Sequence, residues 1–442
     1  MLKVVLFDPI PEKNFRISKD TSGAYGTGND FGDTIIPNIL KRALKYSHDW
    51  PPLHSAYTLA VLKNKNYNSN YTKDLNYDFS NVDVVIIISS IVCCETEIEC
   101  IKKIKKINDK IKIFVIGPFA TNNPEKYIDE KAIVISGEPE FFFLKYDNLL
   151  KFEDGQIIKF DHENSLDDLP FPAWDKMLDS KYKVSLLFGN YKTVPIIATR
   201  GCPYSCFKYC VYPLQQGRKV RQRDPKKIVD ELEYWKKKFN IKMFIFRDPV
   251  FSINRKHTIE LCNEIINRNL KINYIIETHL RILDDELIFL LKKSGLKGVK
   301  VGVESSNLEV LKAADRYTVP KDDQKEKINF LESQNIKVSA MYIIGFPQDN
   351  FKTVNHTIDY SISLNTTYAQ FAVWTPYPGT PIFKEYKEKI FAKKFEEFSQ
   401  YQLVFNHKNL SAKDIRHLLS KAYTKYYFRF KWILKLAKAA IS

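Results

Sequence analysis

Apolar runs of strand length alternate with segments of helical spacing through most of this 442-residue chain. Before residue 150, four runs carry apolar side chains at consecutive positions, which is typical of strands buried on both faces. The runs are residues 3–8, 82–89, 113–117 and 132–136, and helical spacing is found at residues 55–63, 95–108 and 138–149. This alternation predicts an α/β fold that begins with a Rossmann-like, doubly wound parallel sheet.

A second alternating series starts near residue 194. Six apolar runs are separated by stretches that are each long enough for one helix, which predicts a partial (β/α)6 barrel of the TIM type. The runs are residues 194–199, 243–247, 274–278, 298–303, 338–344 and 369–375. We therefore expect four parts: a Rossmann-like domain at 1–150, a linker at 151–193, the barrel at 194–385 and a short helical C-terminal region at 386–442.

The composition excludes a largely disordered chain, because 44% of the residues are hydrophobic and 14% are aromatic. No apolar run reaches the roughly 20 residues that a membrane-spanning helix needs. Seven cysteines, an odd number, fit a reducing compartment better than a disulfide framework, and no targeting signal is evident. We expect a cytoplasmic protein whose thiols are available for metal, and peripheral contact with the inner face of the membrane stays open.

The formal net charge of +16 would suit an anionic partner, but lysines scattered through the sequence contribute much of it. Because dispersed charge mainly favours solubility, we do not expect a nucleic-acid partner. Only the stretch from Lys421 to Ser442 concentrates basic residues, and it holds no acidic one.

If this terminal stretch forms one helix, the basic residues occupy one half and apolar residues the other. The apolar half contains Tyr423, Tyr426, Tyr427, Phe430, Ile433, Leu434, Ala437 and Ile441. Two interpretations stay open: a helix packed on the barrel, or a helix that lies on an anionic membrane with its aromatic face inserted.

Three cysteines, Cys202, Cys206 and Cys210, follow the strand-like run at 194–199, and no fourth cysteine lies nearby. Three closely spaced thiolates on one loop can hold three corners of an iron–sulfur cube and leave one iron free for a substrate. A zinc site would need a fourth ligand from a distant part of the chain, and burial as small hydrophobic residues is the remaining alternative. We expect an iron–sulfur cluster. The cysteines near the first series are predicted to pack in the core: Cys93, Cys94 and Cys100.

Small and polar residues follow the strands of the first series. In doubly wound sheets ligands bind beyond the carboxyl ends of the strands, where this sequence has Ser89, Gly117 and the pair Gly137-Glu138. We expect these four residues to bind a cofactor. The glycine-rich loop at residues 22–29 is either a second ligand contact or an ordinary connector.

Several motifs resemble those of the radical S-adenosylmethionine (SAM) superfamily. Residues 199–206, Thr-Arg-Gly-Cys-Pro-Tyr-Ser-Cys, together with Tyr209-Cys210, look like the cluster loop of that family. The N-terminal part resembles the cobalamin-binding domain that one large branch carries before its barrel, notably in Gly137-Glu138-Pro139-Glu140 and the linker at 169–175. The likeness continues through residues 246–251, 301–305, 344–347 and 376–381, so it covers nearly the whole chain and rests on the order of the motifs.

The resemblance implies a [4Fe–4S] cluster on the three cysteines, bound SAM and cobalamin. By motif match Tyr209 would contact the adenine, Asp248 the amino acid part of SAM, and Glu304 and Ser305 its ribose or amino acid part. Gly345 would let the backbone approach the adenine. Asp248 could instead cap the following segment, and Glu304 could form a salt bridge in the barrel.

Two features depart from the family pattern. The family loop has three residues between the first two cysteines and two before the third, whereas three residues stand in both gaps here. We expect the loop to absorb the added residue, which lengthens the chain by at most about 3.8 Å, as a bulge. The histidine motif Asp-x-His-x-x-Gly is absent, so the cobalt would lack that ligand; an empty domain that only supports the barrel is the alternative.

These observations predict a cobalamin-dependent radical SAM methyltransferase that acts on an unactivated carbon of a small or lipid-like substrate. Such an enzyme implies an electron donor such as flavodoxin or ferredoxin. A non-methylating oxidase or cyclase of the same architecture is the first alternative. A zinc-stabilised basic adaptor without catalysis is the second.

Overall fold

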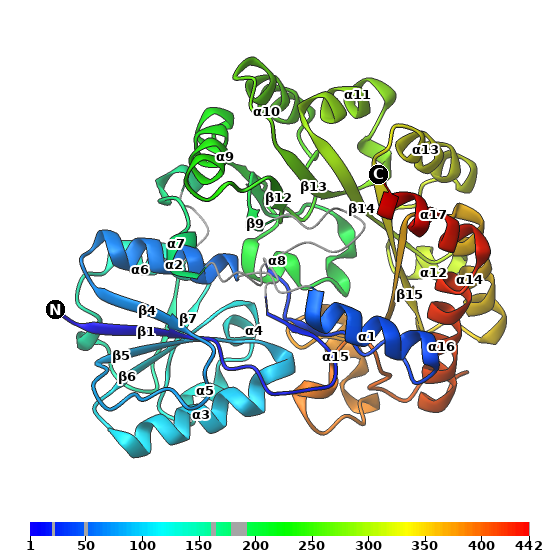
Figure 1. Cartoon of the computed structure of the whole chain (residues 1–442). Helices are drawn as coiled ribbons and strands as arrows, with labels where there is room; N and C mark the ends of the chain where they lie inside the picture. The colour runs from blue at the N-terminus through cyan, green and yellow to red at the C-terminus, as the bar shows by residue number, and fades with distance from the viewer. Residues whose placement is uncertain (20–22, 48–51, 161–164, 178–191, 442) are drawn as a thin grey trace.

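The protein contains two six-stranded parallel sheets, one from each half of the chain (Figure 1). The computed structural model describes residues 1–19, 23–47, 52–160, 165–177 and 192–441. Ser22 of the glycine-rich loop and much of the expected linker therefore lie outside the described residues. The predicted α/β class, with a Rossmann-like sheet followed by a partial barrel, is confirmed.

The first sheet has the strand order β4-β1-β5-β6-β7-β8, and every neighbouring pair is parallel. Helices α2 (Leu53–Asn64) and α6 (Pro139–Lys145) lie on one face, and α3 (Cys94–Ile107) lies on the other (Figure 1). Its strands are β1 (Lys3–Phe7), β4 (Asn68–Thr72), β5 (Val84–Ile88), β6 (Lys112–Ile116), β7 (Ile133–Ser136) and β8 (Ile157–Lys159). Because both faces are covered, central β5 is buried at every position.

The two edge strands of this sheet are the elements that periodicity did not predict. β4 has the sequence Asn-Ser-Asn-Tyr-Thr, and β8 lies within the segment that we expected to be only a linker. An edge strand is half exposed and can be polar, so it leaves no apolar run in the sequence. The cysteines near this sheet are buried, as predicted: Cys93, Cys94 and Cys100.

The second sheet has the order β9-β12-β13-β14-β15-β16, which is the order along the chain. All its neighbouring strands are parallel. The strands are β9 (Thr193–Ile196), β12 (Met243–Phe246), β13 (Asn273–Thr278), β14 (Leu296–Glu304), β15 (Lys337–Ile344) and β16 (Tyr368–Val373). Helices on its outer side include α9 (Pro225–Phe239), α10 (Arg255–Asn267), α11 (Asp285–Ser294), α13 (Lys321–Ser333) and α14 (Phe351–Leu364). Since β9 and β16 end the order, the barrel is open between them.

Helix α16 (Ala412–Tyr427) covers the open edge at β16 with tyrosine hydroxyls. The Tyr423 hydroxyl accepts from the Phe371 N–H at 3.1 Å and donates to the Phe371 carbonyl at 3.0 Å. Tyr427 does the same at Ala369, with distances of 3.1 and 2.7 Å. These hydroxyls satisfy the backbone groups that a further strand would otherwise bind.

The C-terminal stretch is not one helix, so the expectation of a single apolar face from Tyr423 to Ile441 is wrong. Helix α16 ends at Tyr427, Phe428 has a non-helical backbone, and α17 (Phe430–Ile441) starts after the break. The break separates the tyrosines, which face the barrel, from the apolar residues of α17. Among the residues that the structure describes, none of the helices is both long and apolar enough to span a bilayer.

We expect Tyr423→Phe to lower the free energy of unfolding by about 1–3 kcal/mol, because both backbone groups of Phe371 lose their hydroxyl partner. Urea unfolding of the apoprotein measures this change. Tyr46→Phe is the matched control, since Tyr46 is 82% exposed. Equal stability of the two variants would contradict the role given to the Tyr423 hydroxyl.

Candidate active site at the junction of the two sheets

The three-cysteine loop is closed by a short antiparallel pair of strands. β10 (Thr199–Arg200) pairs with β11 (Arg221–Gln222), and the loop between them contains Cys202, Cys206 and Cys210. Gly201 has φ 96°, and a Cβ there would lie 2.1 Å from the Lys219 carbonyl oxygen. Only glycine fits this turn, which directs the chain from the end of β9 into the loop.

The additional residue between Cys206 and Cys210 is taken up by a helical turn and not by the expected bulge. Residues Ser205–Lys208 form one turn of 3₁₀-helix. The N–H groups of Tyr209 and Cys210 both donate to the Cys206 carbonyl, at 3.2 and 3.0 Å. Since winding shortens the chain, the longer spacing still keeps the second and third cysteines on one compact turn.

The environment of the thiols combines burial with one cation. Burial raises the pKa of Cys202 and of Cys206, and the nearby Arg316 guanidinium lowers both. Arg316 follows α12 (Leu308–Ala313), and its Nη1 lies 3.8 Å from the Cys206 Sγ. Burial and the neighbouring Cys206 also raise the pKa of Cys210, so the thiols interact with one another. The donor set fits a cluster held by three thiolates.

No three His, Cys, Asp or Glu side chains within the described ranges converge as the ligands of a single ion would.

Glu304 is the predicted site residue that contacts this cation. Its Oε1 lies 3.2 Å from the Arg316 Nη2, and burial raises the pKa of Glu304 while Arg316 lowers it. Glu304 ends β14 at an irregularity in the pairing with β15, and its φ of 64° is in the left-handed region. This backbone is costly for a residue other than glycine and is typical of functional positions. Here this backbone conformation places the Glu304 carboxylate beside Arg316, which in turn lies beside Cys206 of the cysteine loop.

Tyr209 and Gly345 lie on the same side of the barrel. The Tyr209 ring meets Phe346 edge to face at a centroid distance of 6.2 Å. Gly345 has φ 77°, and a Cβ there would lie 2.8 Å from Ile415 Cδ1 of α16. The Asp349 carboxylate accepts from the N–H groups of Gly345 and Phe346, both at 3.0 Å, and holds this turn. Helix α16 therefore packs against the outer side of the turn at Gly345.

Two other predicted residues hold the backbone, and Asp248 binds an earlier segment of the chain, not the following segment that it could have capped. Its buried carboxylate accepts from the N–H groups of Ala198, at 3.0 Å, and Thr199. Burial outweighs these hydrogen bonds and raises the pKa of Asp248 to about 7. The Ser305 hydroxyl accepts from the Asn307 N–H at 3.1 Å. Their ligand-binding roles stay predictions.

The predicted residues of the first sheet meet at its carboxyl edge. A Cβ on Gly117 would lie 3.0 Å from the Ser89 Oγ, and that Oγ accepts from the Ala120 N–H. The Gly137 N–H donates to the Thr121 hydroxyl at 3.1 Å. Ser89, Gly117 and Gly137 thus occupy the ends of three adjacent strands, as the pattern predicted.

Helix α8 (Tyr212–Gln216) joins this edge to the cysteine loop and lies between the two sheets in Figure 1. The Gln215 Nε2 donates to the Gly137 carbonyl at 3.2 Å. Its Oε1 is buried and has no hydrogen-bond partner among the described residues. A buried amide oxygen without a partner is costly, so Gln215 is a candidate ligand contact at the junction.

Glu138 does not point towards an open ligand site; its carboxylate binds the strands that close the cysteine loop. It receives two hydrogen bonds from Arg221, at 2.8 and 2.7 Å, and lies 2.9 Å from the Arg200 Nη1. Arg200 also pairs with Glu140, whose Oε1 lies 3.1 Å from the His54 Nδ1. Although burial raises the pKa of both carboxyls, the arginines hold each below its usual value. This buried network fastens the first sheet to the loop.

Sequence reasoning missed Arg200, Gln215 and Arg316 as site residues. Arg200 lies inside the loop motif, but only the cysteines of that motif were assigned a role. Arg316 is 110 residues from Cys206, and no local spacing indicates that separation.

The glycine-rich loop packs between the domains. The Tyr25 hydroxyl donates to the Pro378 carbonyl at 2.8 Å, and the Tyr25 ring contacts Phe119 and Tyr377. A Cβ on Gly23 would lie 3.1 Å from the Gln216 side chain. The first part of the loop thus packs near α8 and against the residues before α15 (Pro381–Tyr386), and whether the loop binds a ligand stays a prediction.

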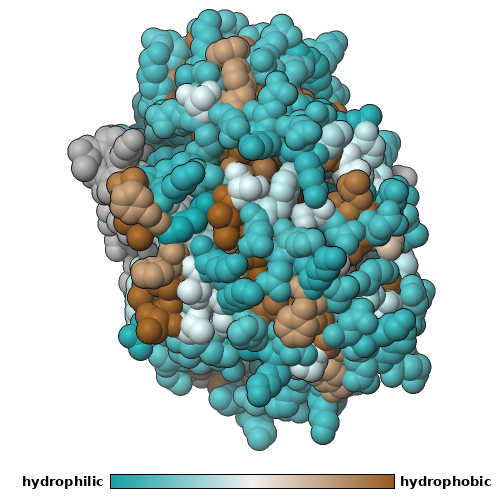
Figure 2. Space-filling view, turned by 90° about the vertical axis from the view of Figure 1, so that its right-hand side faces the viewer, coloured by the Kyte–Doolittle hydropathy of each residue, from teal (hydrophilic) through white to brown (hydrophobic). Residues whose placement is uncertain are grey.

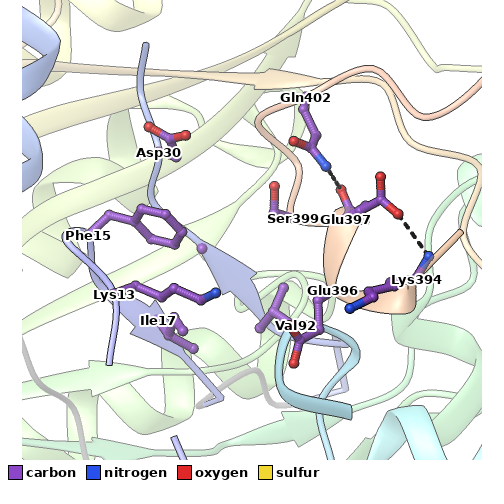
Figure 3. A pocket seen from close by; sticks show the side chains of 11 residues that line it. Lys13, Phe15, Ile17, Asp30, Val92, Lys394, Glu396, Glu397, Ser399 and Gln402 are labelled. Carbon is purple, nitrogen blue, oxygen red and sulfur yellow. Dashed lines mark hydrogen bonds between the residues drawn. The ribbon is translucent and has the colours of Figure 1, made fainter. Parts of the chain in front are cut away.

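A cavity of about 340 Å³ lies apart from the cysteine loop, between the N-terminal segment and residues 394–402 (Figure 3). The Glu397 carboxylate there accepts from the Lys394 N–H, and the Glu397 carbonyl accepts from Gln402. None of the residues predicted to bind the cluster, SAM or cobalamin lines this cavity, but Gly28 of the glycine-rich loop does.

Comparison with known families identifies the barrel segment. Residues 196–361 match the model of the radical SAM superfamily, so the predicted resemblance is confirmed over this segment. The domain implies a [4Fe–4S] cluster and SAM. The protein is therefore an enzyme by class, and we set aside the alternative of a zinc-stabilised adaptor.

Similarity to individual proteins extends over most of the chain. An uncharacterised methyltransferase of Pyrococcus horikoshii is 25% identical over 87% of this chain and 89% of its own length. The anaerobic magnesium-protoporphyrin IX monomethyl ester cyclase of Rubrivivax gelatinosus is 26% identical over 89% of this chain and 76% of its own. The radical SAM methyltransferase TsrM of Kitasatospora setae, solved with cobalamin and a [4Fe–4S] cluster, superposes with a TM-score of 0.62 at 16% identity, covering 88% of this chain and 78% of TsrM. This last likeness shows a shared fold.

We expect Glu138→Gln to lower the free energy of unfolding by about 3–5 kcal/mol, because the arginines would lose one buried counter-charge. The control is Glu286→Gln, which removes an ion pair to Arg255 at a side chain that is 85% exposed, with an expected change of less than about 1 kcal/mol. Urea unfolding of both apoproteins measures the difference. If Glu138→Gln and Glu286→Gln lowered the free energy of unfolding by similar amounts, the buried network would not be what holds the first sheet to the cysteine loop.

Asp248 should give the apoprotein a specific pH dependence. Its folded-state pKa of about 7 is above the usual value of 3.8, so the folded protein keeps a proton that the unfolded chain releases. Wild type should therefore lose stability relative to Asp248→Asn as the pH rises from about 4 to 7, by on the order of 4 kcal/mol. Urea unfolding of both proteins across this range measures it. If the free energies of unfolding of wild type and Asp248→Asn changed equally with pH, the raised pKa of Asp248 would be contradicted.

Proposed function

We propose that the protein is a cobalamin-dependent radical SAM methyltransferase that acts on an unactivated carbon of a small or lipid-like molecule. The observation that carries the proposal is the position of α8, which links the cysteine loop directly to the strand ends of the first sheet. Similarity along most of the chain to a methyltransferase supports it.

The residues on the barrel side have distinct roles in this proposal. Cys202, Cys206 and Cys210 hold the cluster, and Arg316 stabilises the thiolate form of Cys206 by its positive charge. Tyr209 and the backbone at Gly345 border the space for the adenine of SAM. Glu304 keeps Arg316 in place.

The residues on the first sheet hold the second cofactor. Ser89, Gly117 and Gly137 supply a strand-end surface without bulky side chains, and the Gln215 Oε1 offers a buried acceptor beside it. When bound, the cluster with SAM supplies a 5′-deoxyadenosyl radical, and cobalamin supplies a methyl group. The chain itself positions the substrate between the two and excludes water.

A second function, oxidation or cyclisation without methyl transfer, is favoured by the 26% identity to the magnesium-protoporphyrin ester cyclase. Both functions need a one-electron donor, for which we infer a flavodoxin or ferredoxin. We also infer a cytoplasmic protein that contacts the inner face of the membrane through its C-terminal helix.

Anaerobic reconstitution tests the proposal. We expect protein supplied with iron, sulfide and cobalamin to bind all three and to cleave SAM to 5′-deoxyadenosine. Replacement of Cys202, Cys206 or Cys210 by alanine should abolish iron binding and SAM cleavage, whereas Cys262→Ala should retain both, because buried Cys262 lies outside the loop.

Product masses distinguish the functions. Addition of one methyl group to a molecule from a small-molecule or lipid extract would support a methyltransferase, and loss of hydrogen without added carbon would support the oxidase or cyclase. Failure of the reconstituted wild type to cleave SAM would refute both.

A further inference from the structure

The terminal helix α17 attaches to the barrel with its polar side. The Arg429 Nη1 donates to the Ile362 carbonyl at 2.9 Å, and the Lys435 Nζ donates to the Asn365 carbonyl at 2.7 Å. The Trp432 Nε1 donates to the Thr367 carbonyl at 2.9 Å. The first two carbonyls lie at the C-terminal end of α14, where cations are favoured. The Trp432 and Lys435 contacts fix which side of α17 faces the protein, and Arg429 anchors the residue just before the helix.

The opposite side of α17 is therefore apolar and exposed. Phe430, Ile433 and Leu434 are 74%, 45% and 44% exposed, and Phe428 before the helix is 69% exposed. We call these four residues the terminal apolar patch. Figure 2 shows the right-hand side of Figure 1, where apolar side chains, in brown, stand within a mostly hydrophilic surface. A helix that binds its own protein through Trp and Lys side chains and presents Phe, Ile and Leu outward leaves apolar side chains in solvent, where polar ones are usual.

Another exposed apolar side chain, Ile35, follows a residue that contacts α16. The Thr34 hydroxyl lies 2.9 Å from that of Thr424, one helical turn before Phe428. Ile35, the next residue after Thr34, is 77% exposed at the start of α1 (Ile35–Ser47). The N-terminal part of the chain thus adds an exposed apolar side chain next to a residue that contacts α16.

Lysines stand in and beside the patch. Lys431 is exposed within it, and Lys425 on the preceding turn of α16 pairs with Asp359 at 3.3 Å. On the side of α17 that faces the protein, Lys435 pairs with Glu332. The chain holds no acidic residue after Lys421, and its net charge is +16. A surface that combines exposed aromatic and aliphatic side chains with lysines is complementary to anionic headgroups above an apolar layer.

We propose that the terminal apolar patch docks the enzyme on an anionic lipid bilayer, with Phe428, Phe430, Ile433 and Leu434 inserted below the headgroups and Lys431 among them. The patch lies on α17 and the end of α16, outside the cofactor junction. The proposal deepens the membrane contact inferred above and rests on the proposed function only for its use in delivering a lipid-like substrate.

Vesicle flotation of the full chain tests the docking. We expect wild type to float with vesicles of phosphatidylcholine and phosphatidylglycerol in equal parts, and much less with phosphatidylcholine alone. Binding should fall at 1 M salt, where charges are screened within about 3 Å. The double variant Phe430→Ser, Leu434→Ser should bind about tenfold or more weakly, because two apolar side chains no longer enter the layer.

The matched control is Phe289→Ser on α11, since Phe289 is 51% exposed and lies outside the patch. Its binding should equal that of wild type. Equal binding by the double variant, or no binding of wild type to the anionic vesicles, would overturn the proposal. Sedimentation that shows a wild-type dimer, lost in the double variant, without vesicle binding would assign the patch to a second copy of the chain. The assay needs no SAM cleavage, so it is independent of the methyltransferase proposal.

Discussion

The buried ion pairs of Arg200 with Glu138 and Glu140 connect the two halves of the protein two residues before the first loop cysteine. Each of these charges would be strongly destabilising without its partner, so the pairs favour one relative placement of the sheets. The short pairing of β10 with β11 then carries that placement into the cysteine loop, and Arg221 adds two hydrogen bonds to the Glu138 carboxylate. The spacing between the loop and the first sheet thus depends on residues from both domains.

Much of the fold could be predicted from the sequence because the central strands of the first sheet are continuous apolar runs and β15 of the second sheet has apolar residues at alternating buried positions. Ile86 and Ile87 of β5, and Val338 and Ala340 of β15, are all buried. Motif order also identified the radical SAM domain, and the Ser89, Gly117 and Gly137 positions do lie together. Local patterns suffice where the physical cause, burial on a strand or a glycine turn, is itself local.

The remainder depends on contacts between distant residues. The partner of Glu138, Arg221, leaves no pattern in a single sequence, and Glu138 was expected to bind a cofactor because it follows a strand end. The sequence offered a salt bridge as an alternative for Glu304 but did not indicate its partner, Arg316. Helical periodicity also gave a wrong prediction for the C-terminal stretch, which forms two helices and not one. Two non-helical residues, Phe428 and Arg429, change the direction of the helix that follows, so side chains expected on one face with Tyr423 stand on another.

The tyrosines of α16 have a consequence for the behaviour of the chain in solution. The last strand of an open barrel is a template on which another molecule can add a strand, and growth from such an edge leads to fibrils or amorphous precipitate. Tyr423 and Tyr427 occupy both hydrogen-bonding groups of Phe371 and Ala369, so intermolecular sheet extension must first displace a whole helix. Molecules cut short before residue 412 would expose that template.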